Sequence, residues 1–282
     1  MRPWQDRRGR LAPLKAVVFA LLFGPAGVLL GRMAAADLGP RPLTEIIHET
    51  GLWGLRLLFL ALAVTPLRET LRWPQLILVR RMIGVAAFAY LVIHLTVYIG
   101  DQGFDLAHVA AEIASRIYLT IGFGALLMLA ALAATSTDGA IRLLGGRRWQ
   151  ALHRLAYPAA LLATVHFFLQ SKLDVREATV MAGLYVWLML YRVLRALRRP
   201  AIPGPVLLGL LALLVGVVTF GGEALYFWQK SGVDPWRVLA ADLSLRLGPR
   251  PGWIVLGIAL AVALAAALRR ITGPAAGRPA AS

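Results

Sequence analysis

The stretch RRMIGVAAFAYLVIHLTVYIG, residues 80–100, decides the fold of this chain. Two arginines precede a long apolar run that contains one histidine, His94. At a rise of about 1.5 Å per residue, about 20 mostly apolar residues cross the hydrocarbon core of a membrane. The segment therefore predicts a transmembrane helix with an imidazole inside it.

Other segments of the chain have the same apolar character. The predicted spans are 15–31, 51–67, 82–100, 117–134, 150–170, 177–194, 204–221 and 253–269. Of the 282 residues, 59% are hydrophobic and the mean hydropathy is +0.69, which excludes a soluble domain of this length. Because so many spans follow, we interpret the first apolar run as a transmembrane helix rather than a cleaved signal peptide. The sequence predicts an all-α membrane protein, a polytopic helical bundle.

The basic residues are distributed unevenly between the two sides of the predicted membrane. If the chain alternates sides at each span, about two thirds of the 30 Lys and Arg lie on the side of the amino terminus. All acidic residues except Asp6, Glu69 and Asp138 lie on the other side. An excess of Lys and Arg marks the cytoplasmic side, so we expect a multi-pass protein of a bacterial inner membrane with both termini cytoplasmic. The net charge of +16 then reflects topology and contact with anionic lipid rather than a nucleic-acid surface.

Three histidines lie in the predicted spans. His94 and His166, the latter in YPAALLATVHFF, lie in the outer halves of their helices. His153, in GGRRWQALHRLAY, lies near the inner end of the same predicted helix as His166. An ionisable residue in a membrane needs a role or a partner. These depths pair His94 with His166, and the 13 residues that separate His153 from His166 place His153 about 20 Å below that pair.

We interpret these histidines as haem ligands. The chain has no cysteine, so a redox metal must be held by histidine, methionine or carboxylate. Neutral imidazole is a common axial ligand of b-type haem. Small residues that would admit a macrocycle precede His94 and His166: Gly84, Ala86, Ala87, Ala89, Ala159, Ala160 and Ala163. The alternative is that each histidine forms a hydrogen bond with a neighbouring helix.

The position of His153 fits a second haem less well. On an ideal helix, 13 residues at about 100° each place His153 and His166 about 140° apart, so a shared face requires a distortion at Pro158. At the corresponding depth of the facing helix lie Arg80 and Arg81, not a histidine. Either an inner haem is bound by His153 with an arginine or another group near its open side, or no inner haem is present.

Several motifs together resemble one family. PLTEIIHETGLWGLRLL, LAVTPLR, RRMIGVAAFAYLVIHLTVY, ATSTDG, LGGRRWQALHRLAYPAA and SKLDVRE look like the MsrQ family, the haem-binding membrane subunit of the periplasmic methionine sulfoxide reductase system. The resemblance runs from about residue 11 to 198. The family belongs to the ferric reductase-like transmembrane group, which is related to the membrane part of NADPH oxidases. The resemblance implies a six-helix ferric reductase-like core at 15–199, which a tail at 1–14 precedes; the charge distribution places this tail in the cytoplasm. The shorter relatives end near the arginine cluster at 192–199, whereas this chain continues with a two-helix transmembrane extension at 200–282.

The resemblance also implies cofactors and partners. Such subunits carry b-type haem, one or two groups, with FMN also associated, and pass electrons to a periplasmic molybdopterin enzyme that reduces oxidised methionine in proteins. His94, His153 and His166 match histidines of the family motifs. The oxidase relatives have two histidines on each of two helices, whereas this chain has two on one predicted helix and one on the other. The basic inner loop with Arg142, Arg147 and Arg148 would hold flavin phosphate or haem propionates, although retention of basic residues on the inner side explains these arginines at least as well.

The electron donor must lie outside this chain. No glycine-rich dinucleotide motif follows a strand, and no soluble domain is large enough to hold NAD(P)H. The donor is then a cytoplasmic flavin reductase or a membrane quinol, and this chain is an electron-transfer subunit rather than the catalytic one. Two alternative functions are compatible with the sequence: a quinol-linked cytochrome b of another respiratory chain, or a non-redox proton-coupled transporter whose histidines relay protons.

Overall fold

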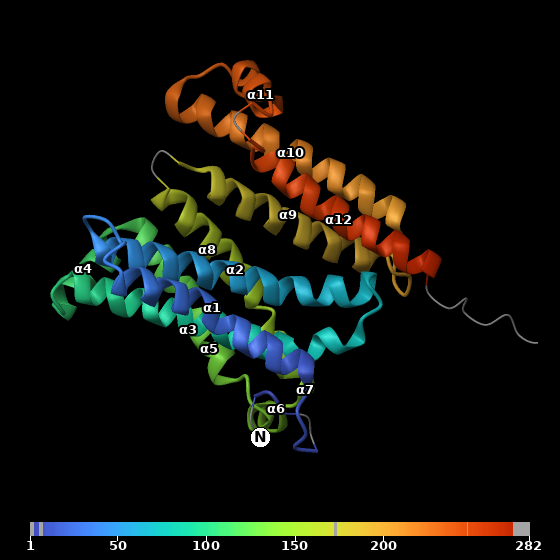
Figure 1. The fold of residues 1–282 in the computed structure, drawn as a ribbon, viewed down its shortest axis with the longest axis horizontal. Coiled ribbons are helices and arrows are strands. Elements are labelled where there is room, and N and C mark those ends of the chain that lie inside the picture. The colour runs from blue at the N-terminus through green and yellow to red at the C-terminus, as the bar shows by residue number, and fades with distance from the viewer. Residues whose placement is uncertain (1–2, 6–7, 172–173, 247, 273–282) are drawn as a thin grey trace, which may run out of the picture. The chain divides into compact units, whose positions relative to one another are not determined.

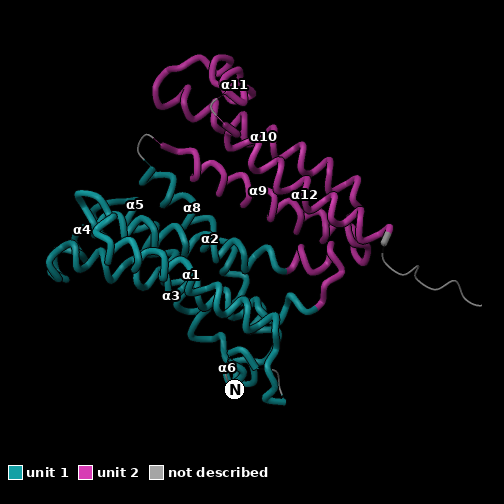
Figure 2. Tube along the Cα trace, in the orientation of Figure 1, with its two compact units in different colours: residues 1–64, 75–173 teal, residues 65–74, 174–282 magenta. Residues whose placement is uncertain are grey.

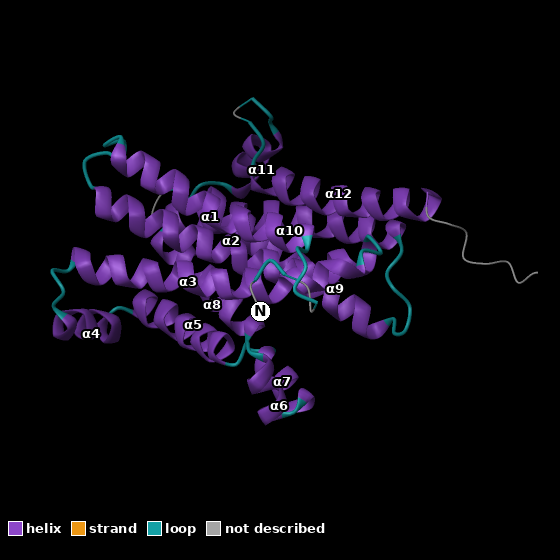
Figure 3. Cartoon of the chain, turned by 60° about the horizontal axis from the view of Figure 1, so that its bottom comes forward, coloured by secondary structure: helices purple, strands orange, loops and turns teal. Residues whose placement is uncertain are grey.

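The computed structural model describes residues 3–5, 8–171, 174–246 and 248–272. In these ranges the regular structure is helical, and a single isolated bridge joins Gln5 and Leu11 (Figures 1 and 3). The predicted all-α class is confirmed. Lys172 and Leu173 of the SKLDVRE motif lie outside the described residues, as do the first residues of the predicted tail and the last residues of the predicted extension.

The described helices follow one another with short connections. They are α1 (Pro13–Ala34), α2 (Pro42–Thr70), the 3-10 turn η1 (Pro74–Leu76), α3 (Ile77–Asp101), α4 (Leu106–Ser115), α5 (Ile117–Ala134), α6 (Asp138–Leu144), α7 (Gly146–His153), α8 (Ala156–Gln170), α9 (Arg176–Leu197), α10 (Pro205–Ser231), α11 (Pro235–Leu243) and α12 (Pro251–Thr272). Within the described residues, seven helices are long and apolar enough to cross a membrane: α1, α2, α3 with η1, α5, α9, α10 and α12. The 15-residue α8 is shorter.

The helices begin where the local sequence permits a start. Helices α1, α2, α10, α11 and α12 each begin at a proline. Proline lacks an N–H, but the first turn of a helix has no intrahelical acceptor for that group, so nothing is lost there. Elsewhere side chains cap the first turn: Asp105 accepts a hydrogen bond from the N–H of His108 in α4, and Thr137 accepts one from Ala140 in α6.

Several helices are longer than the spans predicted for them. Helix α2 has 29 residues and α12 has 22, where the sequence predicts 51–67 and 253–269. The first turns of α2 carry Glu45, His48 and Glu49, which lower the hydropathy without interrupting the helix. Hydropathy therefore located the apolar part of α2 but not its start at Pro42.

The single span predicted at 150–170 is wrong. The structure divides it into α7, which ends at His153, and α8, which begins at Ala156. Pro158 is the third residue of α8, and because it has no N–H it cannot donate a hydrogen bond to the carbonyl of Arg154. The helix therefore breaks before the proline, and His153 and His166 belong to different helices.

The predicted inner loop TSTDGAIRLLGGRR, residues 135–148, is largely helical. It contains α6 and the start of α7, which follow the end of α5 (Figure 3). Gly145 separates the two short helices with φ of +73°, a backbone conformation that residues with a side chain rarely adopt.

The chain forms two compact units (Figure 2). Unit 1 comprises Met1–Val64 and Gln75–Leu173, and in it α5 packs on α8 and α3, while α1 packs on α3. Unit 2 comprises Thr65–Pro74 and Asp174–Ser282, and in it α9, α10 and α12 pack against one another. The last turn of α2 belongs to unit 2, where Glu69 accepts hydrogen bonds from Tyr191 and Arg195.

Candidate functional site

His94 and His166 face each other inside unit 1. His94 lies on α3 and His166 on α8. Their ring centroids are 6.3 Å apart, and the ring planes are nearly perpendicular, at 84°. The structure therefore brings together two of the three histidines predicted for the site.

Each of these imidazoles is fixed by one hydrogen bond to a backbone carbonyl. Nδ1 of His94 lies 2.8 Å from the carbonyl oxygen of Ile47, and Nδ1 of His166 lies 2.8 Å from that of Tyr118. A carbonyl oxygen only accepts, so each Nδ1 carries the proton. Nε2 of each ring is then the unprotonated nitrogen, which is the form that binds a metal.

A glycine lies beside each fixed nitrogen. A Cβ atom at Gly51 would lie 2.8 Å from Nδ1 of His94, and one at Gly122 would lie 2.7 Å from Nδ1 of His166. Each glycine follows the accepting carbonyl residue by four positions, about one helical turn. Helices α2 and α5 thus present the same cradle, a carbonyl and a glycine, to the two histidines.

Neither glycine is among the residues predicted for the site. The prediction considered small residues only on the helices that carry the histidines, whereas the cradles lie on the neighbouring helices. The sequence did carry a signal for these two positions: Gly51, the last residue of HETG, and Gly122, the third residue of TIGFG, each lie inside a helix rather than at a turn. Such a glycine weakens a helix and usually has a packing reason.

The separation of the two rings fits one metal ion between them. Imidazole nitrogens bind metal ions at about 2.0–2.1 Å, so two imidazoles that would share one ion must face each other at close range. The observed 6.3 Å agrees. Within the described part of the chain, no three His, Asp or Glu side chains converge as metal ligands. The pair therefore suits a metal whose other ligands come from a macrocycle, as in haem.

His153 lies at the end of α7 in a different setting. Its ring stacks on Trp149, with centroids 3.8 Å apart, and its Nδ1 is 3.1 Å from the Trp149 carbonyl oxygen. Burial lowers the pKa of His153; the Trp149 carbonyl raises it, and the charges of Arg80 and Arg81 lower it again. Its Nε2 is buried and has no hydrogen-bond partner among the described residues. A neutral imidazole with an unused nitrogen results.

The basic residues predicted for the inner site lie around α7. Arg80 and Arg81 lie at the start of α3, and Arg81 forms an ion pair of 2.7 Å with Asp138. Arg147 and Arg148 lie on the first turn of α7 and are exposed. Arg81 is thus partly neutralised, while Arg147 and Arg148 are open to an anionic group.

Known proteins resemble this chain closely. Residues 50–164 match the family described as the ferric reductase like transmembrane component. The protein-methionine-sulfoxide reductase heme-binding subunit MsrQ of Rhodospirillum rubrum is 43% identical over 196 residues, which cover 69% of this chain and 92% of that protein. MsrQ of Caulobacter vibrioides is 39% identical over 178 residues, or 63% of this chain and 85% of that protein. MsrQ of Xanthomonas campestris pv. campestris (strain 8004) is 42% identical over 191 residues, or 65% and 87%. No solved structure matches the chain.

Proposed function

We propose that this chain transfers electrons, because it belongs to the MsrQ family of heme-binding subunits of protein-methionine-sulfoxide reductase and has a ferric reductase-like transmembrane fold. In this proposal the chain passes electrons through b-type haem to a periplasmic molybdopterin enzyme that reduces oxidised methionine in proteins. The chemistry on the sulfoxide belongs to that partner. This chain is the electron-transfer subunit of the system.

The pair of His94 and His166 is the observation that carries this proposal. We assign His94 and His166 as the residues that would hold one haem through their Nε2 atoms; when bound, that haem would supply reversible one-electron storage. The carbonyls of Ile47 and Tyr118 fix the tautomer and the orientation of the rings. Because two protein nitrogens would hold the metal, the site suits electron transfer rather than binding of a substrate at the metal.

We place a second cofactor position at the inner end of unit 1. The unused Nε2 of His153 supports a role as the ligand of an inner haem. The charges of Arg80 and Arg81 lower the pKa of the His153 imidazole and so favour its neutral form. Arg147 and Arg148 supply cations for haem propionates or for the phosphate of the FMN expected in this family. Haem stoichiometry decides between one haem and two.

The orientation and the donor complete the proposal. The excess of Lys and Arg supports placement in a bacterial inner membrane with cytoplasmic termini, which puts His94 and His166 toward the periplasmic acceptor. The reductant is a cytoplasmic flavin reductase that uses NAD(P)H, or a membrane quinol. Neither of these two electron donors requires a nucleotide-binding domain in this chain.

The absorbance spectrum of the purified protein tests the proposal. Protein from haem-replete cells should show a reduced b-type spectrum, and His94→Ala or His166→Ala should remove most of that haem. His108→Ala is the matched control, since His108 is an exposed histidine on α4. In the same preparations, His153→Ala should lower the haem-to-protein ratio only if a second haem is present. A folded, colourless wild-type protein would contradict the proposed function.

A further inference from the structure

The C-terminal extension in unit 2 buries two of its three acidic residues. Residues 200–282 contain the acids Glu223, Asp234 and Asp242. Asp234 caps the start of α11 and is exposed, whereas Glu223 is 1% exposed and Asp242 is 0% exposed. Glu223 lies on α10, one of the candidate membrane spans, eight residues before its end at Ser231, or about 12 Å along the helix. A carboxyl group this far from water needs a counter-charge or a proton.

The packing of three helices brings the two acids together. The backbone carbonyl of Asp242, at the end of α11, accepts a hydrogen bond of 3.0 Å from the indole of Trp253 on α12. The ring of Trp253 in turn meets the ring of Phe220 on α10, with centroids 5.5 Å apart. Glu223 follows Phe220 by three residues, so both side chains lie on the same face of α10. Helices α10, α11 and α12 therefore enclose both carboxyl groups in one interior (Figure 1).

The hydrogen bonds of these carboxyl groups are incomplete. Oε2 of Glu223 and both carboxyl oxygens of Asp242 are buried and have no hydrogen-bond partner among the described residues. Nε of Arg250 lies 3.3 Å from Oδ1 of Asp242 and forms an ion pair, but it has no hydrogen-bond partner either. Buried polar groups in proteins nearly always have one. Three acceptor oxygens without a donor lack what a proton on one carboxyl group would supply.

The charges around Glu223 do not balance if both acids are ionised. They belong to Asp242, Arg250, Arg176 and Asp174. Arg176 and Asp174, at the start of α9, are exposed and of opposite sign, so they largely cancel. The interior then holds two carboxyl groups and the single cation of Arg250. One proton makes this group neutral, and two adjacent carboxylates in a shared site hold such a proton more tightly than either would alone.

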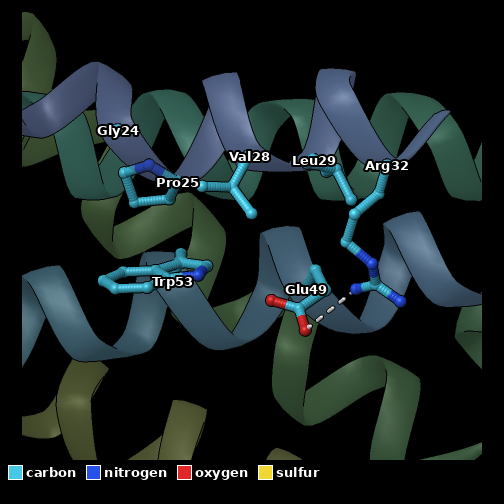
Figure 4. A pocket seen from close by; sticks show the side chains of 7 residues that line it. All are labelled: Gly24, Pro25, Val28, Leu29, Arg32, Glu49 and Trp53. Carbon is cyan, nitrogen blue, oxygen red and sulfur yellow. Dashed lines mark ion pairs between the residues drawn. The ribbon is translucent and has the colours of Figure 1, made fainter. Parts of the chain in front are cut away.

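A similar group in unit 1 shows the alternative to a proton. Arg32 of α1 lies 3.1 Å from Glu45 and 3.9 Å from Glu49 of α2, and Arg32 and Glu49 line a cavity (Figure 4). All three side chains are about a third exposed, so water solvates the carboxylate that the single arginine does not neutralise. Glu223 and Asp242 have no such access to water. A proton must therefore provide there what water provides at Glu49.

We propose that Glu223 and Asp242 form a binding site for one proton, which they share, and that this proton holds α11 in place. Asp242 is the one buried residue of α11, so this helix is anchored through it. In the protonated pair one carboxyl group donates a hydrogen bond to the other, and Arg250 neutralises the remaining charge. The proton comes from water and returns to it past Arg250, whose side chain is 23% exposed. Its loss leaves two like charges that push α11 away from α10.

This inference is independent of the proposed electron-transfer function. None of the residues at the cofactor site takes part in it, and the pair lies in the extension that follows the ferric reductase-like core. Haem content and the reduced spectrum therefore test the proposed function alone, and the measurements below test the proton site alone.

Infrared difference spectroscopy of the full-length protein in lipid nanodiscs tests the shared proton. A protonated carboxyl group has a C=O stretching band that a carboxylate lacks. The wild type should show this band at neutral pH and lose it in alkaline buffer. Glu223→Gln and Asp242→Asn should each remove the band, because the remaining acid then pairs with Arg250 and ionises. Absence of the band in the wild type would overturn the site, as would its survival in Asp242→Asn, which would mean that Glu223 holds a proton by itself.

Matched controls identify the source of the band. Glu49→Gln and Asp234→Asn make the same chemical changes at exposed acids and should leave the band unchanged. Loss of the band in either control would overturn its assignment to the buried pair. Replacement of sodium by choline at constant pH should also have no effect. A band that sodium abolishes would show that the pair binds a metal cation, and would overturn the proton site.

Hydrogen exchange of the backbone amides tests the link to α11. After correction for the intrinsic dependence on pH, the amides of Pro235–Leu243 should exchange at least about tenfold faster in alkaline than in neutral buffer. The short helix α4 should show no such change. In Glu223→Gln the pH dependence of α11 should disappear, because Asp242 and Arg250 remain as a neutral pair. Exchange of α11 that does not change with pH in the wild type would overturn the link without any variant, as would equal pH dependence in Glu223→Gln.

Discussion

Gly122→Ala should expel the haem by displacing His166. The new Cβ would lie 2.7 Å from Nδ1 of His166 and 2.9 Å from Cε1 and Cγ of the same ring. An ordinary contact begins at 3.4 Å, so the imidazole must retreat by about 0.7 Å. His166 is one of the two facing rings, so this movement changes their separation of 6.3 Å.

The size of the effect follows from two contributions. Retreat of the ring strains or breaks the 2.8 Å hydrogen bond to Tyr118, which is worth about 0.5–1.5 kcal/mol. Overpacking of a helix interface costs about 1–3 kcal/mol more. Their sum of about 1.5–4.5 kcal/mol corresponds to roughly 10- to 10³-fold weaker haem retention at about 1.4 kcal/mol per factor of ten.

The assay is the haem-to-protein ratio and the reduced spectrum of the purified variants. Gly124→Ala is the control on the same helix, because its Cβ would meet only Leu162 at 3.9 Å and alanine favours a helix over glycine by about 1 kcal/mol. Haem should be lost in Gly122→Ala and kept in Gly124→Ala. Full haem content with an unchanged spectrum in Gly122→Ala would refute the reasoning about the cradle.

Two further predictions concern unit 2. Burial raises the pKa of Asp242 against the opposing effect of Arg250, 3.3 Å away, so the folded state binds the proton more tightly than the unfolded state. Stability therefore falls as pH rises above the unfolded pKa of about 3.9. Asp242→Asn should raise Tm at neutral pH and lose that advantage as the pH falls toward the unfolded pKa, whereas a lower Tm at neutral pH would show that the ion pair outweighs burial. Glu69→Ala removes the carboxylate that accepts hydrogen bonds from the Tyr191 hydroxyl, 3.0 Å away, and from Nε of Arg195, 3.1 Å away. The substitution should lower the free energy of unfolding by about 1–3 kcal/mol in a thermal or denaturant melt. An unchanged melt would mean that water replaces both hydrogen bonds.

The local parts of the fold could be predicted from the sequence because they depend on neighbouring residues. Apolar runs such as 82–100 and 117–134 reappear within α3 and α5, since crossing a membrane requires only length and hydropathy. The prediction failed where a local feature had to be weighed against the helix pattern. Pro158 divides the span at 150–170 into two helices, and the charged first turns of α2 extend a helix that hydropathy alone would shorten.

The sequence by itself determined the helical membrane class, the family and the candidate histidines. The tertiary structure alone decided how those histidines are used. Nδ1 of His94 reaches a carbonyl 47 positions away and Nδ1 of His166 one 48 positions away, so these bonds depend on which helix faces meet. The cradles at Gly51 and Gly122 arise from the same meeting of faces. Helix periodicity fixes the face on which a side chain lies, but only packing decides what lies opposite that face.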